Sequence, residues 1–157
     1  MKLLMSIVYV AVIGILAHYV GESLPRGLFS EYKFPYRAFK WERDGKFYNR
    51  LNIKKWKNHL PDMSRIMRDM LPKRITFDAT SDNIDALIKE TCVAECVHWG
   101  LIAASLGIFL FWRSGWAVLF WLVYNFSGNL PFIIIQRYNR PRLVMLEQRR
   151  QRRMAKA

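Results

Sequence analysis

The chain has 157 residues, a hydrophobic content of 52% and a formal net charge of +13 at pH 7. This length excludes a string of several domains, and a soluble single domain rarely combines so much apolar content with such strong basicity. Small membrane proteins with basic cytoplasmic parts combine the two easily. Cys92 and Cys96 lie four positions apart on a helical pattern. They match neither a disulfide framework nor a Cys-x-x-Cys site, so we interpret them as small helix residues.

Three segments are long and apolar enough to be transmembrane helices. Residues 3–20 and 116–135 contain no formally charged side chain, and residues 93–112 contain only Glu95 and His98 as ionisable groups. An α-helix needs about 20 mostly apolar residues to cross the hydrocarbon core. The first segment resembles a cleaved signal peptide, but it is long for one and lacks a small-x-small exit, so we expect a retained helix.

The distribution of Lys and Arg predicts the orientation of these spans. The connector 21–92 holds 15 of the 25 basic residues, the chain after residue 135 holds 8, and the loop 113–115 holds 1. Basic loops stay in the cytoplasm, and three spans put both rich segments on that side. We therefore predict an all-α, multi-pass protein of the cytoplasmic membrane. It has about three transmembrane helices with interfacial amphipathic helices between them, and forms a single membrane domain.

Residues 21–80 are expected to form a cytoplasmic interfacial region. The cluster 21–27 contains helix breakers and marks the exit from the membrane. Residues 29–47 alternate aromatic and basic side chains, which suits the lipid headgroup layer and predicts contacts with membrane lipids. Nucleic-acid binding uses the same residue types, but we do not expect it beside three spans.

Two amphipathic helices are predicted within this region. Residues 46–60 form the first, which Pro61 ends. Its apolar face comprises Phe47, Leu51, Trp56 and Leu60. A second, shorter helix carries a stripe that is more typical of packing than of ligand binding. That stripe comprises Met63, Ile66, Met67 and Met70.

The second and third spans are expected to pair as an antiparallel hairpin. Residues 82–112 form one long helix that includes the second span, and residues 113–115 are too few for anything but a tight turn. Matching the two helices residue by residue from this turn places Asn129 opposite His98. The same register places Arg137 opposite Glu90.

Polar residues follow one face of the third span and continue into the basic tail 136–157. Asn125 and Asn129 are four positions apart, and Gln136 continues the stripe. Amides within a span turn inward, because nothing in lipid satisfies them. The span then ends in a dense group of hydrogen-bond donors. These are Gln136, Arg137, Tyr138, Asn139, Arg140 and Arg142.

These residues are suited to base-assisted attack by a hydroxyl on an acyl group. His98 can accept a proton near neutral pH, and Glu95, three positions earlier, can orient the ring and stabilise the imidazolium. Asn129 or a rim arginine could donate to the oxyanion. Arg137, Arg140 and Arg142 could bind the phosphate of coenzyme A or acyl carrier protein. The sequence predicts a membrane acyltransferase with a cytoplasmic donor and no bound cofactor.

Other interpretations of the same residues remain open. His98 could be a hydrogen-bonded packing group, and the rim arginines could simply anchor the chain to the inner leaflet. Glu95-x-x-His98 is half of a di-iron motif, but the other two histidines have no Glu three residues before them, so we predict no metal. A cysteine nucleophile is disfavoured by the nearby Glu95. The competing class is a non-catalytic membrane subunit that packs its polar stripe against a partner.

Three patches of the sequence resemble a known family. The first is 45–49 with 55–57, the second runs from Glu90-Thr91 through Ala94-Glu95 to His98-Trp99, and the third is 129–131 with 136–143. Their order and spacing resemble the glycosyl-4,4'-diaponeurosporenoate acyltransferase family over about half of the chain. Residues 63–80 and 100–126 match it only in hydrophobicity.

The resemblance implies a small bacterial membrane enzyme that esterifies the sugar of a carotenoid glycolipid with a fatty acyl group. The glycolipid acceptor and the acyl carrier would be its partners, alongside a possible second copy or complex subunit. The matched residues imply a site on both sides of the hairpin. They are Glu90, Glu95, His98, Asn129, Gln136, Arg137, Tyr138, Asn139, Arg140 and Arg142.

Overall fold

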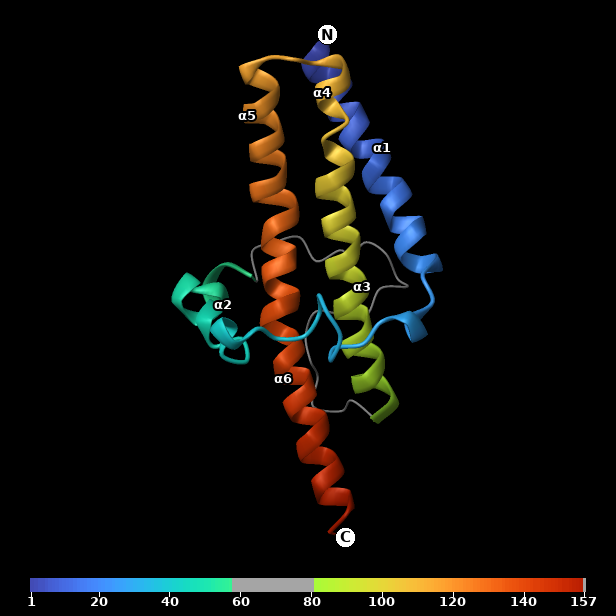
Figure 1. Ribbon diagram of the computed structural model, residues 1–157, viewed down its shortest axis with the longest axis vertical. Coiled ribbons are helices and arrows are strands. Elements are labelled where there is room, and N and C mark those ends of the chain that lie inside the picture. The colour runs from blue at the N-terminus through green and yellow to red at the C-terminus, as the bar shows by residue number, and fades with distance from the viewer. Residues whose placement is uncertain (58–80, 157) are drawn as a thin grey trace. The chain divides into compact units, whose positions relative to one another are not determined.

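Figure 1 shows a computed structural model of the chain, which describes residues 1–57 and 81–156. Within those ranges every regular element is a helix and there is no strand. Three helices are long and apolar enough to cross a membrane, namely Lys2–Ser23, Ile84–Phe111 and Gly115–Met154. The prediction of an all-α protein with three candidate transmembrane helices is confirmed.

The chain divides into two compact units. The first, which we call the apolar unit, comprises Met1–Pro25 and Val93–Ile134. The second, the basic unit, comprises Arg26–Cys92 and Ile135–Ala157. Two helices, α3 (Ser81–Ser105) and α6 (Leu130–Met154), contribute residues to both units.

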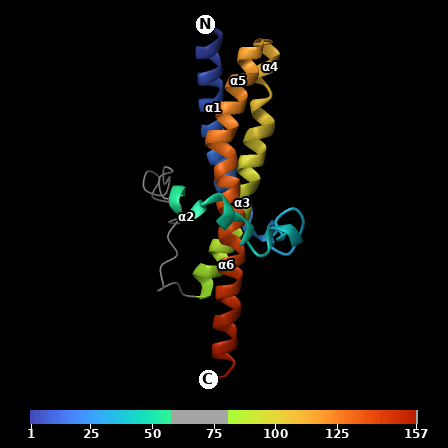
Figure 2. The same cartoon turned by 90° about the vertical axis from the view of Figure 1, so that its left-hand side faces the viewer.

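The apolar unit is a bundle of parallel and antiparallel helices. Helix α1 (Lys2–Ser23) and helix α5 (Gly115–Tyr124) run beside the rod formed by α3 and α4 (Ile108–Phe111), as both views show (Figures 1 and 2). Most large apolar side chains of α1 point outward and are exposed. These include Leu3, Leu4, Val8, Ile15 and Leu16. Such a surface needs an apolar solvent, which a lipid bilayer supplies.

The helix predicted over 82–112 is interrupted near its end, which corrects that expectation. Helix α3 ends at Ser105, and α4 begins at Ile108. The hydroxyl of Tyr9 donates to the carbonyl of Ala104 at 2.8 Å, and the backbone there forms i, i+3 hydrogen bonds. A Cβ atom at Gly107 would lie 2.2 Å from the Tyr9 hydroxyl. The interruption between α3 and α4 therefore lies where Tyr9 of α1 closely approaches this helix.

The third span contains a π-helical turn and continues beyond the predicted end. The turn, η5 (Asn125–Asn129), links α5 to α6, and α6 runs on to Met154 through most of the predicted tail 136–157. The N–H of Leu130 bonds to the carbonyl of Asn125, five residues earlier. Pro131 follows without an N–H of its own, so the ordinary helical bonding pattern is broken at this point.

In the basic unit, short helical turns and the loops between them contact parts of α3 and α6. Its short elements are η1 (Arg26–Leu28), η2 (Lys40–Glu42), η3 (Phe47–Leu51) and α2 (Ile53–Trp56). A small core joins α3 to α6 through Ile84, Ile88 and Leu143.

The first predicted amphipathic helix, 46–60, is not continuous. Asn52 has φ 51° and ψ 31°, a left-handed conformation that separates η3 from α2. The resulting twist turns the chain, so Tyr48 and Ile53 are buried while Leu51 is exposed. The prediction of one continuous helix is therefore wrong within residues 46–57, and Leu60 and Pro61 lie outside the described residues. The second predicted helix, with Met63, Ile66, Met67 and Met70, lies outside the described residues.

Candidate active site

His98 and Asn129 meet inside the apolar unit. The Nδ1 atom of His98 on α3 lies 3.0 Å from the Oδ1 atom of Asn129 in η5. The imidazole also stacks on the ring of Phe132, with centroids 5.0 Å apart and planes inclined by 10°. The contact agrees with the register predicted from the hairpin, which placed Asn129 opposite His98.

The contact continues as a chain of hydrogen bonds, which we call the amide relay (His98, Asn129, Asn125 and Ser105). Asn129 Nδ2 donates to Asn125 Oδ1 at 3.0 Å. Asn125 Nδ2 donates to Ser105 Oγ at 3.2 Å and to the carbonyl of Trp121 at 2.9 Å. Both asparagines are only 2% exposed, so their polar atoms depend on these internal partners.

The π-helical turn explains why the two asparagines align. The turn spans positions 125 to 129, and residues four apart in it lie about one turn from each other, so the two asparagines share one side of the helix. Such turns frequently occur at functional sites. The expectation that Asn125 and Asn129 share an inward face is confirmed by their burial.

Glu95 lies on α3, three residues before His98, and is fully buried. A carboxylate is costly to bury in an apolar bundle. An ionisable residue at such a position therefore marks a candidate functional site. Its proximity along the helix suits stabilisation of a protonated His98. The Nδ1 side of that imidazole, however, meets Asn129.

Asn129 has a different set of contacts from the one expected of an oxyanion donor. Its oxygen lies against His98 and its amide nitrogen donates to Asn125. These contacts favour a role in orienting the histidine. Ser105 was not identified from the sequence, although a hydroxyl within an otherwise apolar span is the signal that could have found it.

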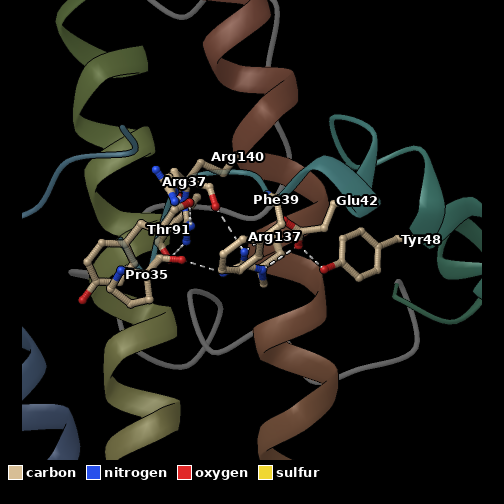
Figure 3. Close-up of polar contacts among 9 residues, drawn as sticks. Pro35, Arg37, Phe39, Glu42, Tyr48, Thr91, Arg137 and Arg140 are labelled. Carbon is tan, nitrogen blue, oxygen red and sulfur yellow. Dashed lines mark hydrogen bonds and ion pairs between the residues drawn. The ribbon is translucent and has the colours of Figure 1, made fainter. Parts of the chain in front are cut away.

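In the basic unit, Arg137 and Glu42 form a buried ion pair (Figure 3). Arg137 Nε donates to Glu42 Oε1 at 2.6 Å and Arg137 Nη2 donates to Glu42 Oε2 at 2.9 Å. The same guanidinium donates to the carbonyls of Pro35 and Arg37, at 3.0 Å and 3.3 Å. The Tyr48 hydroxyl also donates to Glu42, and the Phe39 N–H does so at 2.6 Å.

Arg140 binds a second part of the same unit. Its Nε and Nη2 atoms donate to the hydroxyl and carbonyl of Thr91, each at 2.8 Å, and its Nη1 donates to the carbonyl of Tyr36 at 2.7 Å. Arg140 is only 3% exposed. Both Arg137 and Arg140 therefore connect α6 to neighbouring segments, and these bonds occupy the guanidinium groups expected to bind a carrier phosphate.

The remaining rim residues lie along α6. Arg142 packs its guanidinium over the Tyr138 ring, 3.3 Å from the centroid, and donates to the Tyr138 carbonyl. Tyr138 is buried, whereas Gln136 and Asn139 are half-buried. The loop residue Gly45, with φ +80°, approaches this stretch so closely that a Cβ there would lie 3.1 Å from the Tyr138 carbonyl.

Arg137 and Glu90, which the hairpin register places opposite one another, bind different partners. Glu90 instead accepts from Arg26 Nε at 2.7 Å and from Nη2 at 3.2 Å, while Arg137 binds Glu42. The reason is that residues 26–42 fold back and supply a partner for each charge. Sequence reasoning matched only the two helices and could not place this segment.

The contacts around the buried ion pair shift the pKa values of Glu42 and Tyr48. Burial alone would raise the pKa of Glu42, but hydrogen bonds from Arg137, Tyr48 and the Phe39 N–H outweigh it and lower that pKa. Burial and the hydrogen bond to Glu42 raise the pKa of Tyr48. Glu42 is therefore held as a carboxylate and Tyr48 as a neutral donor.

A cavity of about 390 Å³ lies beside this pair, within the range of ligand pockets. Its walls include Tyr32, Tyr36, Arg37, Val144, Met145 and Gln148, and no member of the amide relay lines it. Among residues 1–57 and 81–156, no group of three or more His, Cys, Asp or Glu side chains is placed to hold a metal ion.

Sequence comparison identifies the family. The pattern described as glycosyl-4,4'-diaponeurosporenoate acyltransferase matches residues 32–149. A protein of that name from Staphylococcus aureus strain bovine RF122 / ET3-1 is 33% identical over 129 residues, which cover 81% of this chain and 76% of the relative. Relatives from strains MRSA252 and N315 are 32% and 31% identical with the same coverage. No solved structure matches the chain. The chain belongs to the glycosyl-4,4'-diaponeurosporenoate acyltransferase family and is an acyltransferase.

Proposed function

We propose that the protein transfers a fatty acyl group to a sugar hydroxyl of a membrane glycolipid, a carotenoid glycoside or a similar compound. The relatives are named for glycosyl-4,4'-diaponeurosporenoate, an acceptor that carries both a sugar and a long apolar chain. An acceptor of this kind would reside in the bilayer. Family membership favours this enzymatic role over a non-catalytic membrane subunit.

The observation that carries the mechanism is the contact between His98 Nδ1 and Asn129 Oδ1. With its Nδ1 oriented in this way, His98 would accept the proton of the sugar hydroxyl on Nε2. The hydroxyl oxygen then attacks the acyl carbonyl and forms the new ester bond. The carrier's sulfur departs with the bonding electron pair and takes the proton from His98. Buried Glu95 would stabilise the transient imidazolium.

The acyl donor in this proposal is acyl-CoA or an acyl carrier protein, both of which carry phosphate groups. Arg137 and Arg140 are engaged within the protein, so the donor's phosphate would instead meet exposed basic side chains toward the end of α6. These include Arg149, Arg152 and Arg153. No bound cofactor enters this reaction.

The proposed location is the cytoplasmic membrane of a bacterium, with the residues between the first two spans and the end of α6 on the cytoplasmic side. The support is the uneven distribution of Lys and Arg, with 15 of 25 in residues 21–92. The named relatives are bacterial. This orientation would present the basic residues to a cytoplasmic acyl donor.

The proposal is tested by comparing His98→Gln with wild type in membranes supplied with radiolabelled acyl-CoA and glycosyl-4,4'-diaponeurosporenoate. Loss of a general base is expected to lower the rate by about 10²–10⁴-fold. His18→Gln on α1 is the matched control and should keep wild-type activity. Wild-type turnover by His98→Gln would rule out the proposed base. A wild-type protein that acylates neither this glycoside nor a second glycolipid, from either carrier, would overturn the proposed function.

A further inference from the structure

We infer that Asn125 and Ser105 are positioning residues that set the tautomer of His98, holding its proton on Nδ1 and leaving Nε2 as the accepting nitrogen. The inference rests on the proposed role of His98 as the base. It concerns two residues whose hydrogen bonds reach the imidazole through Asn129. The contacts of the amide relay carry it, because each hydrogen bond in it fixes the direction of the next.

The direction begins at two backbone carbonyls, which can only accept. The carbonyl of Ile102 lies 2.7 Å from Ser105 Oγ, so the serine hydrogen is donated there. Ser105 Oγ can then only accept from Asn125, at 3.2 Å. The carbonyl of Trp121, 2.9 Å from Asn125 Nδ2, can likewise only accept. The amide group of Asn125 must therefore point its nitrogen at both.

The orientation of Asn125 determines that of Asn129. With its nitrogen committed, Asn125 presents Oδ1 to Asn129, and only the amide nitrogen of Asn129 can face an oxygen at 3.0 Å. Asn129 must then present its own oxygen to His98. That oxygen lies 3.0 Å from Nδ1, which can bond to it only by carrying a hydrogen. A neutral imidazole with its proton on Nδ1 has its lone pair on Nε2.

Reversing the relay would be costly at every step. A flipped Asn125 would direct an oxygen at the Trp121 carbonyl and leave buried polar groups unsatisfied. The surroundings offer little compensation, since Ser105 is fully buried and Asn125 is 2% exposed. Packing alone would not require this order, because an apolar side chain of similar volume could fill either position. The inference is thus specific to hydrogen-bond direction.

The test measures the tautomer directly. Full-length protein labelled with ¹⁵N-histidine is placed in lipid nanodiscs, and the two ring nitrogens of His98 are identified by the loss of their signals in His98→Gln. At a pH where the ring is neutral, wild type is expected to show a protonated Nδ1 and an unprotonated Nε2. The same preparations are assayed for acyl transfer, so tautomer and turnover are compared in each variant.

Four variants grade the effect. Asn129→Leu removes the acceptor at Nδ1 and should lose the fixed tautomer together with about 10²-fold in rate. Asn129→Asp keeps an oxygen facing Nδ1 but loses the donor to Asn125 Oδ1, so it should keep the tautomer and lose less activity than Asn129→Leu. Asn125→Leu removes the group that fixes the amide orientation of Asn129. It should give a mixture of His98 tautomers and lower the rate by about 10-fold. Ser105→Ala keeps the hydrogen bond from Asn125 Nδ2 to the Trp121 carbonyl, so its effect on the tautomer and the rate should be smaller than that of Asn125→Leu.

Ser127→Ala is the matched control for Ser105→Ala. Its hydroxyl also donates to a backbone carbonyl, that of Val123 at 2.6 Å, but it lies outside the amide relay. It should change neither the tautomer nor the rate.

Wild-type His98 protonated on Nε2, or Asn125→Leu with an unchanged tautomer, would overturn the inference. An Nδ1 proton in wild type together with full turnover by His98→Gln would instead overturn the proposed base and leave the relay's orientation intact. An Asn129→Leu protein that fails to fold leaves Asn129→Asp and Asn125→Leu to decide between these outcomes.

Discussion

The two units of this protein handle buried polar groups in different ways. Besides the buried carboxylate of Glu95, the apolar unit holds neutral amides and a hydroxyl, whose hydrogen bonds run in one direction from Ser105 to His98. The basic unit buries full charges. Arg137 donates hydrogen bonds to the Glu42 carboxylate and to a nearby backbone carbonyl, that of Pro35. Neutral hydrogen bonds suit the apolar unit, since charges are far more costly than amides in an apolar surrounding, and Glu95 is the exception there.

The two kinds of buried polar contact therefore do different things: one gives hydrogen bonds a fixed direction, and the other joins segments of the chain. A chain of neutral hydrogen bonds has a polarity, so it can impose one tautomer on a base at its end. A guanidinium only donates, and its several N–H groups reach several acceptors at once. Arg137 and Arg140 therefore hold segments together, whereas in our proposal the amide relay orients His98 as the base.

The largest expected effect on stability comes from breaking the buried ion pair. Glu42→Ala leaves the Arg137 guanidinium without its carboxylate, in a site where their side chains are only 10% and 2% exposed. The loss in free energy of unfolding is expected to be about 3–5 kcal/mol, measured by denaturant unfolding in detergent. Adding Arg137→Met should restore most of it, and Asp85→Ala, at an exposed acid, should change little.

Acidification should weaken the basic unit through the same carboxylate. Because the pKa of Glu42 in the folded protein lies below its ordinary value of 4.5, its contribution is fully present above pH 4.5 and is lost as pH falls through the folded pKa. The difference in free energy of unfolding between wild type and Glu42→Gln should therefore shrink below pH 4.5. A difference that stays constant down to pH 3 would contradict the assigned role of the carboxylate.

The smallest effect is expected at the more exposed pair of Arg26 and Glu90, whose side chains are 29% and 34% exposed. Arg26→Ala should lower the free energy of unfolding by at most about 1 kcal/mol, and added salt should reduce the difference. A loss as large as that of Glu42→Ala would show that exposure does not distinguish the two ion pairs.

The sequence was most informative where periodicity and chain connectivity sufficed. The spans followed from runs of apolar residues, and the tight turn at 113–115 set the register that brought Asn129 to His98. It was least informative in residues 26–57. There a left-handed Asn52 divides the expected helix, and Glu42, the partner of Arg137, lies 95 positions away in the sequence.

The sequence by itself determined an all-helical chain with three candidate spans and a histidine facing an asparagine, because hydrophobic periodicity and short connections are local properties. Only the tertiary structure decided which charges pair and which way the amides point. Arg137 binds Glu42, although the hairpin register placed Glu90 opposite it, and Asn125 has two amide orientations of equal shape. The first choice depends on the carbonyl of Pro35, 102 positions away, and the second on Ser105 of α3, in addition to the Trp121 carbonyl one turn earlier in the same helix.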